Sequence, residues 1–363
     1  MKNHFYCVIM AGGIGSRFWP VSREAKPKQF IRLSRTGKSF IQQAFERFAG
    51  ILPKENILVV TQSRYLDLVK EHLPEVAEDN IILEPYNRNT APCVALAAYT
   101  LLKRDPEAVM VATPADHIIL DEDIFRDTLN NALNYASQSN ALITLGVVPD
   151  RPDTNFGYIQ GVYGQEQKDN KPIKVKTFTE KPDADLAEVF FQSGEFYWNS
   201  GIFVWKASAI RDELEAHMPE VRSLFAGWET ALDSDSEKPF LENVYSSISK
   251  ISIDYAVMEK TSNAWMFPCK FRWFDIGSWE SLYSYISKTE GEGNVIWGGP
   301  SLCKNNQNCF IFTNDKDKLV AVRGLDNYIV VDTGDVLLIC PRDEHQAKDV
   351  IANLAMPDFE QYR

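Results

Sequence analysis

The chain has 363 residues, of which 45% are hydrophobic and 24% are charged, a composition typical of a soluble globular protein long enough for two domains. Its formal net charge of -12 argues against a nucleic-acid binder, which presents a basic face. No apolar run approaches the ~20 residues of a membrane helix, and the first run ends in Gly-Gly without a signal-peptide cleavage region. Six scattered cysteines suggest neither zinc nor a disulfide framework. We therefore expect a cytoplasmic protein that binds neither nucleic acid nor membrane.

Short apolar runs alternate with amphipathic stretches from the start of the chain to about residue 150. The runs that we predict as buried strands are 5–12, 56–61, 80–85, 108–116 and 141–148. The stretches with helical spacing are 40–50, 64–73, 90–104 and 122–138. This alternation predicts an α/β fold with a parallel sheet covered on both faces. Ligands of such sheets bind beyond the carboxyl ends of the strands.

The pattern of predicted strands and helices changes twice after this α/β region. Between 155 and 285 the strands 157–163, 174–182 and 200–208 mix with helices near 183–193 and 207–217, which predicts an extension of the same sheet and a lid. After 290–294, short β-rich runs at 309–315, 318–324 and 327–340 are separated by Asn, Asp and Gly turns, with a helical tail near 344–354. We predict a catalytic domain over 1–288 and a small C-terminal β-rich domain over 289–363.

A glycine loop follows the first strand, and two cations accompany it. Gly12, Gly13 and Gly15 let the backbone turn tightly and bring N–H groups close to a ligand. Arg17 and Lys28 could then neutralise phosphate oxygens that the N–H groups do not reach. The loop lacks the G-K-[ST] of a Walker motif and the third glycine of a dinucleotide fingerprint. We favour a polyphosphate site over a glycine turn with solvated cations, because proline before Lys28 restricts the backbone there.

Two aspartates are candidates for holding a metal ion. Asp116 ends the predicted strand "VMVATPADH", and Asp275 lies among aromatic residues in "FRWFDIGSW". Two carboxylates that converge on Mg²⁺ would bridge phosphates and stabilise charge during phosphoryl chemistry. The alternatives are a helix N-cap for Asp116 and a turn for Asp275, but the glycine loop favours the metal. We interpret His117 either as structural or as a residue that supports the metal ligands from behind, since phosphoryl transfer by an anionic nucleophile needs no proton transfer.

A third group of polar residues fits a sugar phosphate. Glu180 and Lys181 place a carboxylate beside an ammonium at the end of a predicted strand, one suited to hydroxyls and the other to a phosphate. Asn199 in "FYWNSG" offers a polar contact within an apolar wall. The alternative is a solvated strand end and a turn asparagine.

Seven motifs together resemble the sugar-nucleotidyltransferase family. They occur in the family's order across roughly 10–280 and read "GGIGSRFWPVSREAKPKQF", "EPYNRNTAP", "TPADH", "FTEKP", "WNSGIF", "SIDYAVMEK" and "DIGSW". The first two resemble the mannose-1-phosphate guanylyltransferase branch rather than its uridylyl and thymidylyl relatives.

The resemblance implies a Rossmann-like nucleotidyltransferase core with a mixed, mostly parallel sheet, and a C-terminal partial left-handed β-helix. It places Gly12, Gly13 and Gly15 along the nucleotide, Arg17 and Lys28 on its phosphates, and Asp116 and Asp275 on Mg²⁺. For the sugar phosphate it implies Gly157, Glu180, Lys181 and Asn199, and it places Asp254 close to the sugar phosphate or the metal. A guanine edge needs acceptors for two N–H groups and one donor, which "EPYNRNTAP" could supply through Glu84, Asn87, Asn89 and Thr90.

The implied reaction is guanylyl transfer from GTP to mannose 1-phosphate, which yields GDP-mannose and pyrophosphate. The sugar phosphate is already anionic at neutral pH, so no general base is needed. The resemblance also implies a homodimer, and we expect a single activity because no cupin-type isomerase region follows.

Three alternatives remain open from the sequence. One is nucleotidyl transfer to a different sugar 1-phosphate or from a different nucleotide. Another is a non-catalytic sugar-nucleotide sensor on the same fold, which the retained aspartates oppose. The third is a dinucleotide-dependent oxidoreductase, against which the missing third glycine counts.

Overall fold

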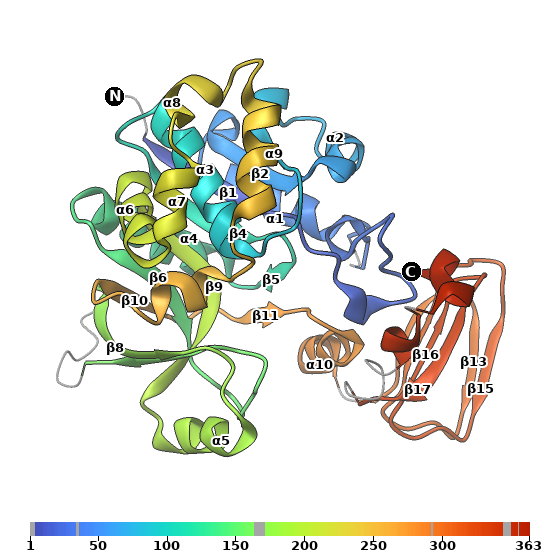
Figure 1. Cartoon of the computed structure of the whole chain (residues 1–363). Helices are drawn as coiled ribbons and strands as arrows, with labels where there is room; N and C mark the ends of the chain where they lie inside the picture. The colour runs from blue at the N-terminus through green and yellow to red at the C-terminus, as the bar shows by residue number, and fades with distance from the viewer. Residues whose placement is uncertain (1–3, 34–35, 163–170, 292, 344–349, 355) are drawn as a thin grey trace. The chain divides into compact units, whose positions relative to one another are not determined.

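The computed structural model describes residues 4–33, 36–162, 171–291, 293–343, 350–354 and 356–363 (Figure 1). They form two compact units, each built from separate stretches of the chain. The first unit comprises Met1–Gly12, Ile41–Ala115 and Ile119–Trp273, and the second comprises Gly13–Phe40, Asp116–Ile118 and Phe274–Arg363. Among the described residues, no helix combines the length and the apolar character needed to cross a membrane.

A nine-stranded sheet forms the centre of the first unit, in the order β3-β2-β1-β4-β9-β6-β10-β8-β7. Its strands are β1 (Phe5–Met10), β2 (Ile57–Gln62), β3 (Ile81–Glu84), β4 (Val109–Pro114), β6 (Leu142–Val147), β7 (Tyr158–Gly161), β8 (Ile173–Thr179), β9 (Phe196–Lys206) and β10 (Ala264–Cys269). The strands predicted over the first 150 residues are confirmed, whereas β10 and the first half of β9 were not predicted.

The sheet is mixed, as predicted. Neighbours are parallel from β3 to β4, where helices connect successive strands, and β10 is parallel to β6. The long strand β9 runs antiparallel to both β4 and β6, so it separates two parallel segments. Parallel strands direct their carboxyl ends to one edge, which places the residues after β1, β3 and β4 at that edge.

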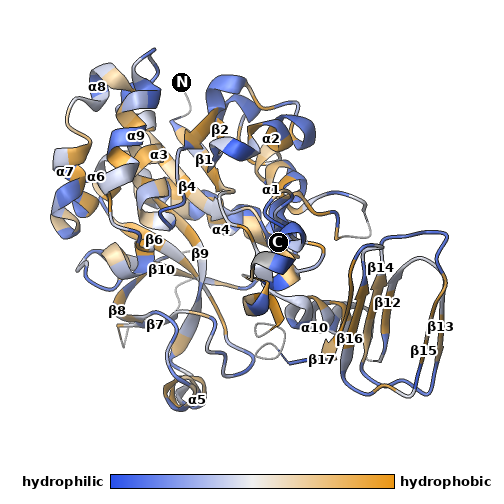
Figure 2. Ribbon diagram, turned by 45° about the vertical axis from the view of Figure 1, so that its right-hand side comes forward, coloured by the Kyte–Doolittle hydropathy of each residue, from blue (hydrophilic) through white to orange (hydrophobic). Residues whose placement is uncertain are grey.

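Helices cover both faces of this sheet, whose strands form the orange interior in Figure 2. The helices of the first unit are α1 (Phe40–Ala49, of which Phe40 belongs to the second unit), α2 (Leu66–His72), α3 (Thr90–Arg104), α4 (Glu122–Ser137), α5 (Ala184–Ser193), α6 (Ala207–His217), α7 (Pro219–Leu224), α8 (Trp228–Ala231) and α9 (Glu237–Ser247). Residues of α3, α6 and α9 share one buried cluster with Val8 of β1. Because side chains alternate along a strand, the fully buried Cys7 and Ile9 point to the other face. The run of twelve buried residues in α3, Ala91–Leu102, explains why this helix fits between the sheet and α6.

The second unit contains short, mostly parallel β-strands wound in two sheets. Strands β12 (Val295–Gly298), β14 (Phe310–Thr313), β16 (Tyr328–Asp332) and β17 (Leu337–Pro341) form one sheet, and β13 (Ser301–Lys304) and β15 (Val320–Arg323) form the other. The pairs β12–β14, β14–β16 and β13–β15 are parallel, an arrangement typical of a β-helix coil. The predicted C-terminal β-rich element is thus confirmed. Helix α10 (Trp279–Glu290) precedes it. Of the predicted helical tail, 350–353 are helical and 344–349 lie outside the described residues.

From Gly13 onward the glycine loop belongs to this second unit, and it packs against the start of α10. The indole N–H of Trp279 donates to the carbonyl of Trp19 at 2.9 Å, and its ring meets that of Phe18 edge-on at 5.0 Å. Both Phe18 and Trp279 are almost completely buried. Large aromatic contacts of this kind anchor the loop to the unit.

Two further contacts join the loop to the C-terminal part of the same unit. The Arg23 guanidinium makes a two-pronged ion pair with Asp335, at 2.7 and 2.9 Å. The Trp19 indole N–H donates to the carbonyl of Tyr362 at 2.7 Å. A bidentate guanidinium–carboxylate contact fixes orientation as well as distance, so these contacts fix the loop against the C-terminal part of the unit.

Candidate functional site

The glycine loop folds back on itself and thereby positions Lys28. Gly15 adopts left-handed backbone angles, φ 68° and ψ 43°, and a Cβ at this position would overlap the Cβ of Lys28. The Lys28 amide donates to the carbonyl of Ile14 at 3.2 Å, and the Ser22 hydroxyl donates to the same carbonyl at 2.7 Å. Glycine is needed at 15 for both its φ and its missing side chain.

The Lys28 ammonium lies between two carboxylates. It donates to Asp116 Oδ2 at 2.7 Å and lies 3.8 Å from Asp275 Oδ1. The rings of Phe18 and Phe40 flank it, with centroids 5.5 and 5.6 Å away, and Lys28 is only 3% exposed. An ammonium that is shielded from water acts more strongly on nearby charges than a solvated one. The cluster therefore consists of one buried ammonium group that lies close to two carboxyl groups.

Asp116, Asp275 and His117 could together hold a metal ion. One ligand atom from each lies within 4.8 Å of the others. Burial pushes the pKa of Asp116 up, but the charge of Lys28, the neighbouring His117 and the Lys28 hydrogen bond outweigh it, so that the pKa lies below its ordinary value. Carboxylate oxygens are the donors that a hard divalent cation prefers, so the predicted metal ligands Asp116 and Asp275 fit such an ion.

Arg17 approaches the segment that carries Asp275. A Cβ at Gly277 would come within 3.1 Å of the Arg17 Nη2 atom, so the guanidinium lies against the backbone of the "DIGSW" motif. The next residue, Ser278, caps α10 through a reciprocal capping box with Ser281. The motif thus ends the short strand β11 (Trp273–Asp275), contacts a guanidinium and begins α10 within five residues.

In the first unit, Glu84 ends β3 beside the end of the first strand. It is 4% exposed, and a Cβ at Gly12 would come within 3.1 Å of its Oε2 atom. Burial raises the pKa of Glu84 to about 7, although a hydrogen bond from Tyr245 lowers it in part. A carboxyl group with a pKa displaced to this range marks a candidate functional position.

The three other predicted base-reading residues shape the turn between β3 and α3. The Asn87 side chain donates to the Gly12 carbonyl at 3.3 Å and accepts from the Asn89 amide at 3.1 Å. Asn89 caps α3 by accepting from the Thr90 amide at 2.8 Å. The Thr90 hydroxyl accepts from the Ile253 amide at 2.9 Å. These asparagines and the threonine are therefore engaged in building the turn.

The predicted sugar-phosphate residues come together at the other end of the first unit's sheet. A Cβ at Gly157 would overlap Glu180 Oε2 and lie 3.3 Å from the Cβ of Asn199. The Asn199 amide donates to the Gly157 carbonyl at 2.8 Å, and the Lys181 ammonium donates to Glu180 Oε1 at 2.5 Å. Gly157 thus allows two polar side chains to approach a strand closely.

Asp254 joins this group through Asn199, whose side-chain amide donates to Asp254 Oδ1 at 2.9 Å. The carbonyl oxygen of that amide accepts from the Thr144 hydroxyl at 2.8 Å, which orients it. Burial and the charge of Glu180 raise the pKa of Asp254 to about 7, while Lys181 lowers it. Glu180 and Lys181 thus form one hydrogen-bonded pair and Asn199 and Asp254 another, and the charges of the first pair act on Asp254.

The structure gathers the predicted residues into three clusters. One lies in the second unit and contains Lys28, Asp116 and Asp275, and two lie in the first unit, around Glu84 and around Glu180. Thr144 and Tyr245 contact predicted site residues but were missed. Neither lies in a glycine-, proline- or charge-marked motif, so only knowledge of tertiary contacts would have indicated them.

Two family models match the chain. The nucleotidyl transferase model matches residues 6–292, and the mannose phosphate isomerase/GMP-like β-helix domain model matches residues 305–354. The latter agrees with the coiled parallel strands of the second unit.

Two curated relatives and one solved structure resemble the chain over most of its length. A mannose-1-phosphate guanylyltransferase of Escherichia coli is 38% identical over 342 residues, which cover 93% of this chain and 71% of that protein. One from Escherichia coli strain K12 is 36% identical, and the match covers all of this chain and 76% of that protein. A crystal structure described as a mannose-1-phosphate geranyltransferase from Thermus thermophilus is 29% identical, covers 98% of this chain and all of that one, and superposes with a TM-score of 0.85.

These matches extend over nearly all of the chain and agree with its mixed sheet and its β-helix coil. The chain belongs to the nucleotidyl transferase family.

Proposed function

We propose that this protein is a mannose-1-phosphate guanylyltransferase, which joins GTP and mannose 1-phosphate into GDP-mannose and releases pyrophosphate. The observation that carries the chemistry is the buried Lys28 ammonium 2.7 Å from Asp116 and 3.8 Å from Asp275. The names of relatives up to 38% identical support the choice of substrates.

The reaction needs charge screening rather than proton transfer. Both reactants are anions, and the attacking oxygen of the sugar phosphate carries no proton at neutral pH. Lys28, Arg17 and Lys181 are the cations that would screen their repulsion and orient the phosphates, which accounts for most of the rate in such transfers. A bond forms between the sugar-phosphate oxygen and the α-phosphorus of GTP, and the bond from that phosphorus to the α–β bridging oxygen breaks. The bridging oxygen leaves with pyrophosphate as an anion, so neither an acid nor a base is needed.

Asp116 and Asp275 would hold Mg²⁺. With such an ion bound, the two aspartates would keep positive charge beside the phosphates and so reduce the repulsion that the nucleophile meets. Two carboxylates suit a small hard cation that keeps several waters, whereas the imidazole of His117 suits softer ions. His117 is therefore not required as a ligand.

Glu84 would select guanine, with Gly12, Gly13 and Gly15 along the nucleotide. Its ionised carboxylate can accept from the N–H groups of the base. Asn87, Asn89 and Thr90 would act by holding the turn, because their side-chain oxygens already accept backbone hydrogen bonds.

The cluster of Gly157, Glu180, Lys181, Asn199 and Asp254 would bind mannose 1-phosphate. Carboxylates and an amide accept and donate to hydroxyls, and the Lys181 ammonium attracts the phosphate. The half-exposed Lys181 is placed to meet a solvated phosphate.

We also infer a homodimer, a cytoplasmic location and a domain boundary after residue 288. The family models, which end at residue 292 and begin at residue 305, support a boundary in that region.

The test is pyrophosphate release over a matrix of four nucleoside triphosphates and of mannose, glucose and galactose 1-phosphates, with and without Mg²⁺. We expect the fastest release from GTP with mannose 1-phosphate, and only with Mg²⁺. Faster release from another pair would overturn the specificity. If no pair releases pyrophosphate but calorimetry shows that the protein binds GDP-mannose, the protein is a sugar-nucleotide sensor and not an enzyme.

A further inference from the structure

A buried tyrosine on α9 holds one oxygen of the Glu84 carboxylate. Tyr245 is fully buried, and its hydroxyl donates to Glu84 Oε1 at 2.9 Å and lies 3.2 Å from the Pro92 carbonyl. A hydroxyl has one proton, and the shorter distance assigns it to the carboxylate. The two side chains come from positions 161 residues apart in the chain.

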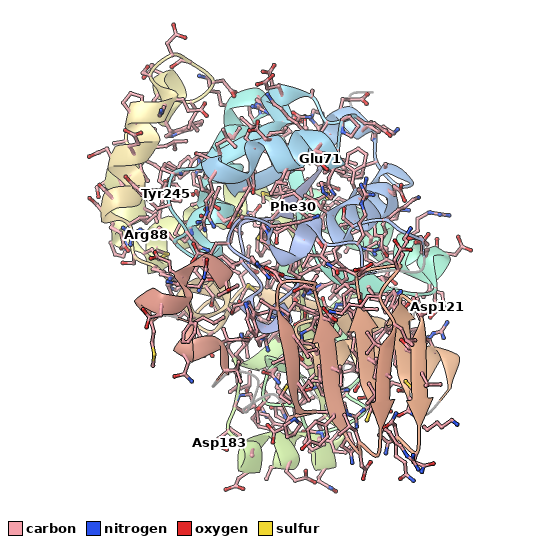
Figure 3. All side chains as sticks on the ribbon, turned by 90° about the vertical axis from the view of Figure 1, so that its right-hand side faces the viewer. Phe30, Glu71, Arg88, Asp121, Asp183 and Tyr245 are labelled. Carbon is pink, nitrogen blue, oxygen red and sulfur yellow. The ribbon has the colours of Figure 1, made fainter. Side chains whose placement is uncertain are left out.

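The end of α9 is fixed to the same turn through Arg88. The Arg88 Nε atom donates to the Tyr245 carbonyl at 2.8 Å, and its Nη2 atom donates to the Ser246 carbonyl at 3.2 Å. Figure 3 shows Arg88 and Tyr245 side by side at this end of the helix. Arg88 follows Glu84 by four residues, so both ends of the turn contact Tyr245. The tyrosine is therefore a fixed donor rather than a mobile one.

The other oxygen of Glu84 is directed toward Gly12 of the same unit. Oε2 faces Gly12, where an added Cβ would come within 3.1 Å. Over the described part of the chain, no side chain or backbone group donates a hydrogen bond to this oxygen. A carboxylate with one oxygen held by a protein donor keeps the other for a ligand.

We propose that Tyr245 is a positioning residue for guanine recognition, which holds Glu84 Oε1 so that Oε2 accepts an N–H of the base. This inference rests on the proposed role of Glu84 in binding GTP. Tyr245 touches neither the base nor the reacting atoms, and it acts on the orientation and the charge of Glu84.

The surroundings of Glu84 predict how this contact depends on pH. The titratable side chains that face it are Tyr245 of α9 and Cys93 of α3, while β2 presents the uncharged Gln62, which pairs with Glu84 in register. Burial raises the pKa of Glu84 to about 7, and the tyrosine stabilises the ionised form. Removal of the hydroxyl raises this pKa further. A larger fraction of Glu84 is then protonated at pH 7 and unable to accept from guanine.

The experiment compares Tyr245→Phe with the wild type by steady-state pyrophosphate release between pH 6 and 9. We expect the KM for GTP to rise about tenfold at pH 7, the worth of one hydrogen bond to a charged group, with kcat within about twofold. The rise should shrink toward pH 9, where Glu84 ionises in both proteins. The KM for mannose 1-phosphate should not change.

Tyr99→Phe is the matched control. Its hydroxyl is also buried against a carboxylate, donating to Glu215 at 2.8 Å, and it lies on α3. This variant should keep the wild-type KM for GTP at every pH.

The outcomes separate the inference from the proposed function. Wild-type enzyme that releases no pyrophosphate from GTP contradicts the function itself. Active wild-type enzyme with an unchanged GTP KM and pH profile in Tyr245→Phe overturns the role of Tyr245 alone. If Tyr245→Phe does not fold, Glu84→Gln decides, because the inference requires a raised GTP KM that no longer varies with pH. A wild-type KM in Glu84→Gln would reject it.

Discussion

Glu84→Gln should change how the stability of the protein depends on pH. The ordinary pKa of a glutamate is 4.5, and burial raises that of Glu84 to about 7. Between these two values the folded protein keeps a proton that the unfolded chain has lost. The folded state therefore binds more protons, and the free energy of unfolding falls as the pH rises through this window.

The size of the effect follows from the difference in pKa. A rise from 4.5 to about 7 corresponds to about 3 kcal/mol of stability that is present below pH 4.5 and lost by about pH 8. No discount for solvent applies, because Glu84 is only 4% exposed. A glutamine accepts the Tyr245 hydroxyl through its carbonyl oxygen and does not titrate. The variant should therefore gain about 3 kcal/mol over the wild type between pH 4.5 and pH 8.

Urea unfolding followed by tryptophan fluorescence, without nucleotide, at pH 4.5, 6, 7 and 8 measures this difference. Glu71→Gln is the control, because the Glu71 side chain is 66% exposed and the variant should follow the wild type at each pH. A Glu84→Gln protein whose stability differs from the wild type by the same amount at pH 4.5 and pH 8 would refute the reasoning. Glu84 would then ionise as readily in the folded chain as in water.

Three further predictions concern the second unit. Lys28→Met should lower kcat by about 100-fold or more with an unchanged circular dichroism spectrum. The control Lys26→Met, at an exposed position of the same loop, should keep wild-type turnover. Equal rates in the two variants would remove Lys28 from the mechanism. Gly15→Ala should lose stability, because a left-handed residue with a side chain costs about 1–2 kcal/mol. It should also lose turnover, because the new Cβ overlaps Lys28 and displaces it. Gly37→Ala has φ 70° and open space around its Cβ, so it should lose stability in urea but not turnover, and equal losses in both assays would exclude the overlap as the cause. Chelation with EDTA should abolish pyrophosphate release and added Mg²⁺ should restore it; full activity in EDTA would contradict the metal assignment.

The strands and helices of the first 150 residues follow from local patterns. Apolar runs such as 5–10 and 109–114 are long enough and uninterrupted enough to be recognised as buried strands. By contrast, β10 contains Pro268, which argues against a strand in sequence alone. It forms nonetheless, with Pro268 opposite Gly146 of β6 in a parallel register, and Met266 of the same strand fills the space that a Cβ at Gly146 would take.

Site residues divide in the same way. Lys28, Asp116 and Asp275 stand next to glycine or proline or at strand ends, and these local signals led to the cluster that the structure contains. Tyr245 has no such signal, since it lies in an ordinary amphipathic helix and reaches Glu84 only through the tertiary fold. The raised pKa values of Glu84 and Asp254 likewise depend on burial, which no local pattern specifies.

The discontinuity of the second unit has a consequence for biosynthesis. The ribosome releases Gly13 early, but Asp335, which binds Arg23 of the same unit, is made more than 300 residues later. At about 5–20 residues per second, translation leaves roughly 15–65 s between the two. During that interval the nascent polypeptide carries an unpartnered segment with Phe18 and Trp19 open to water and to chaperones. Folding of the segment that carries Lys28 therefore waits for the last coil of the β-helix.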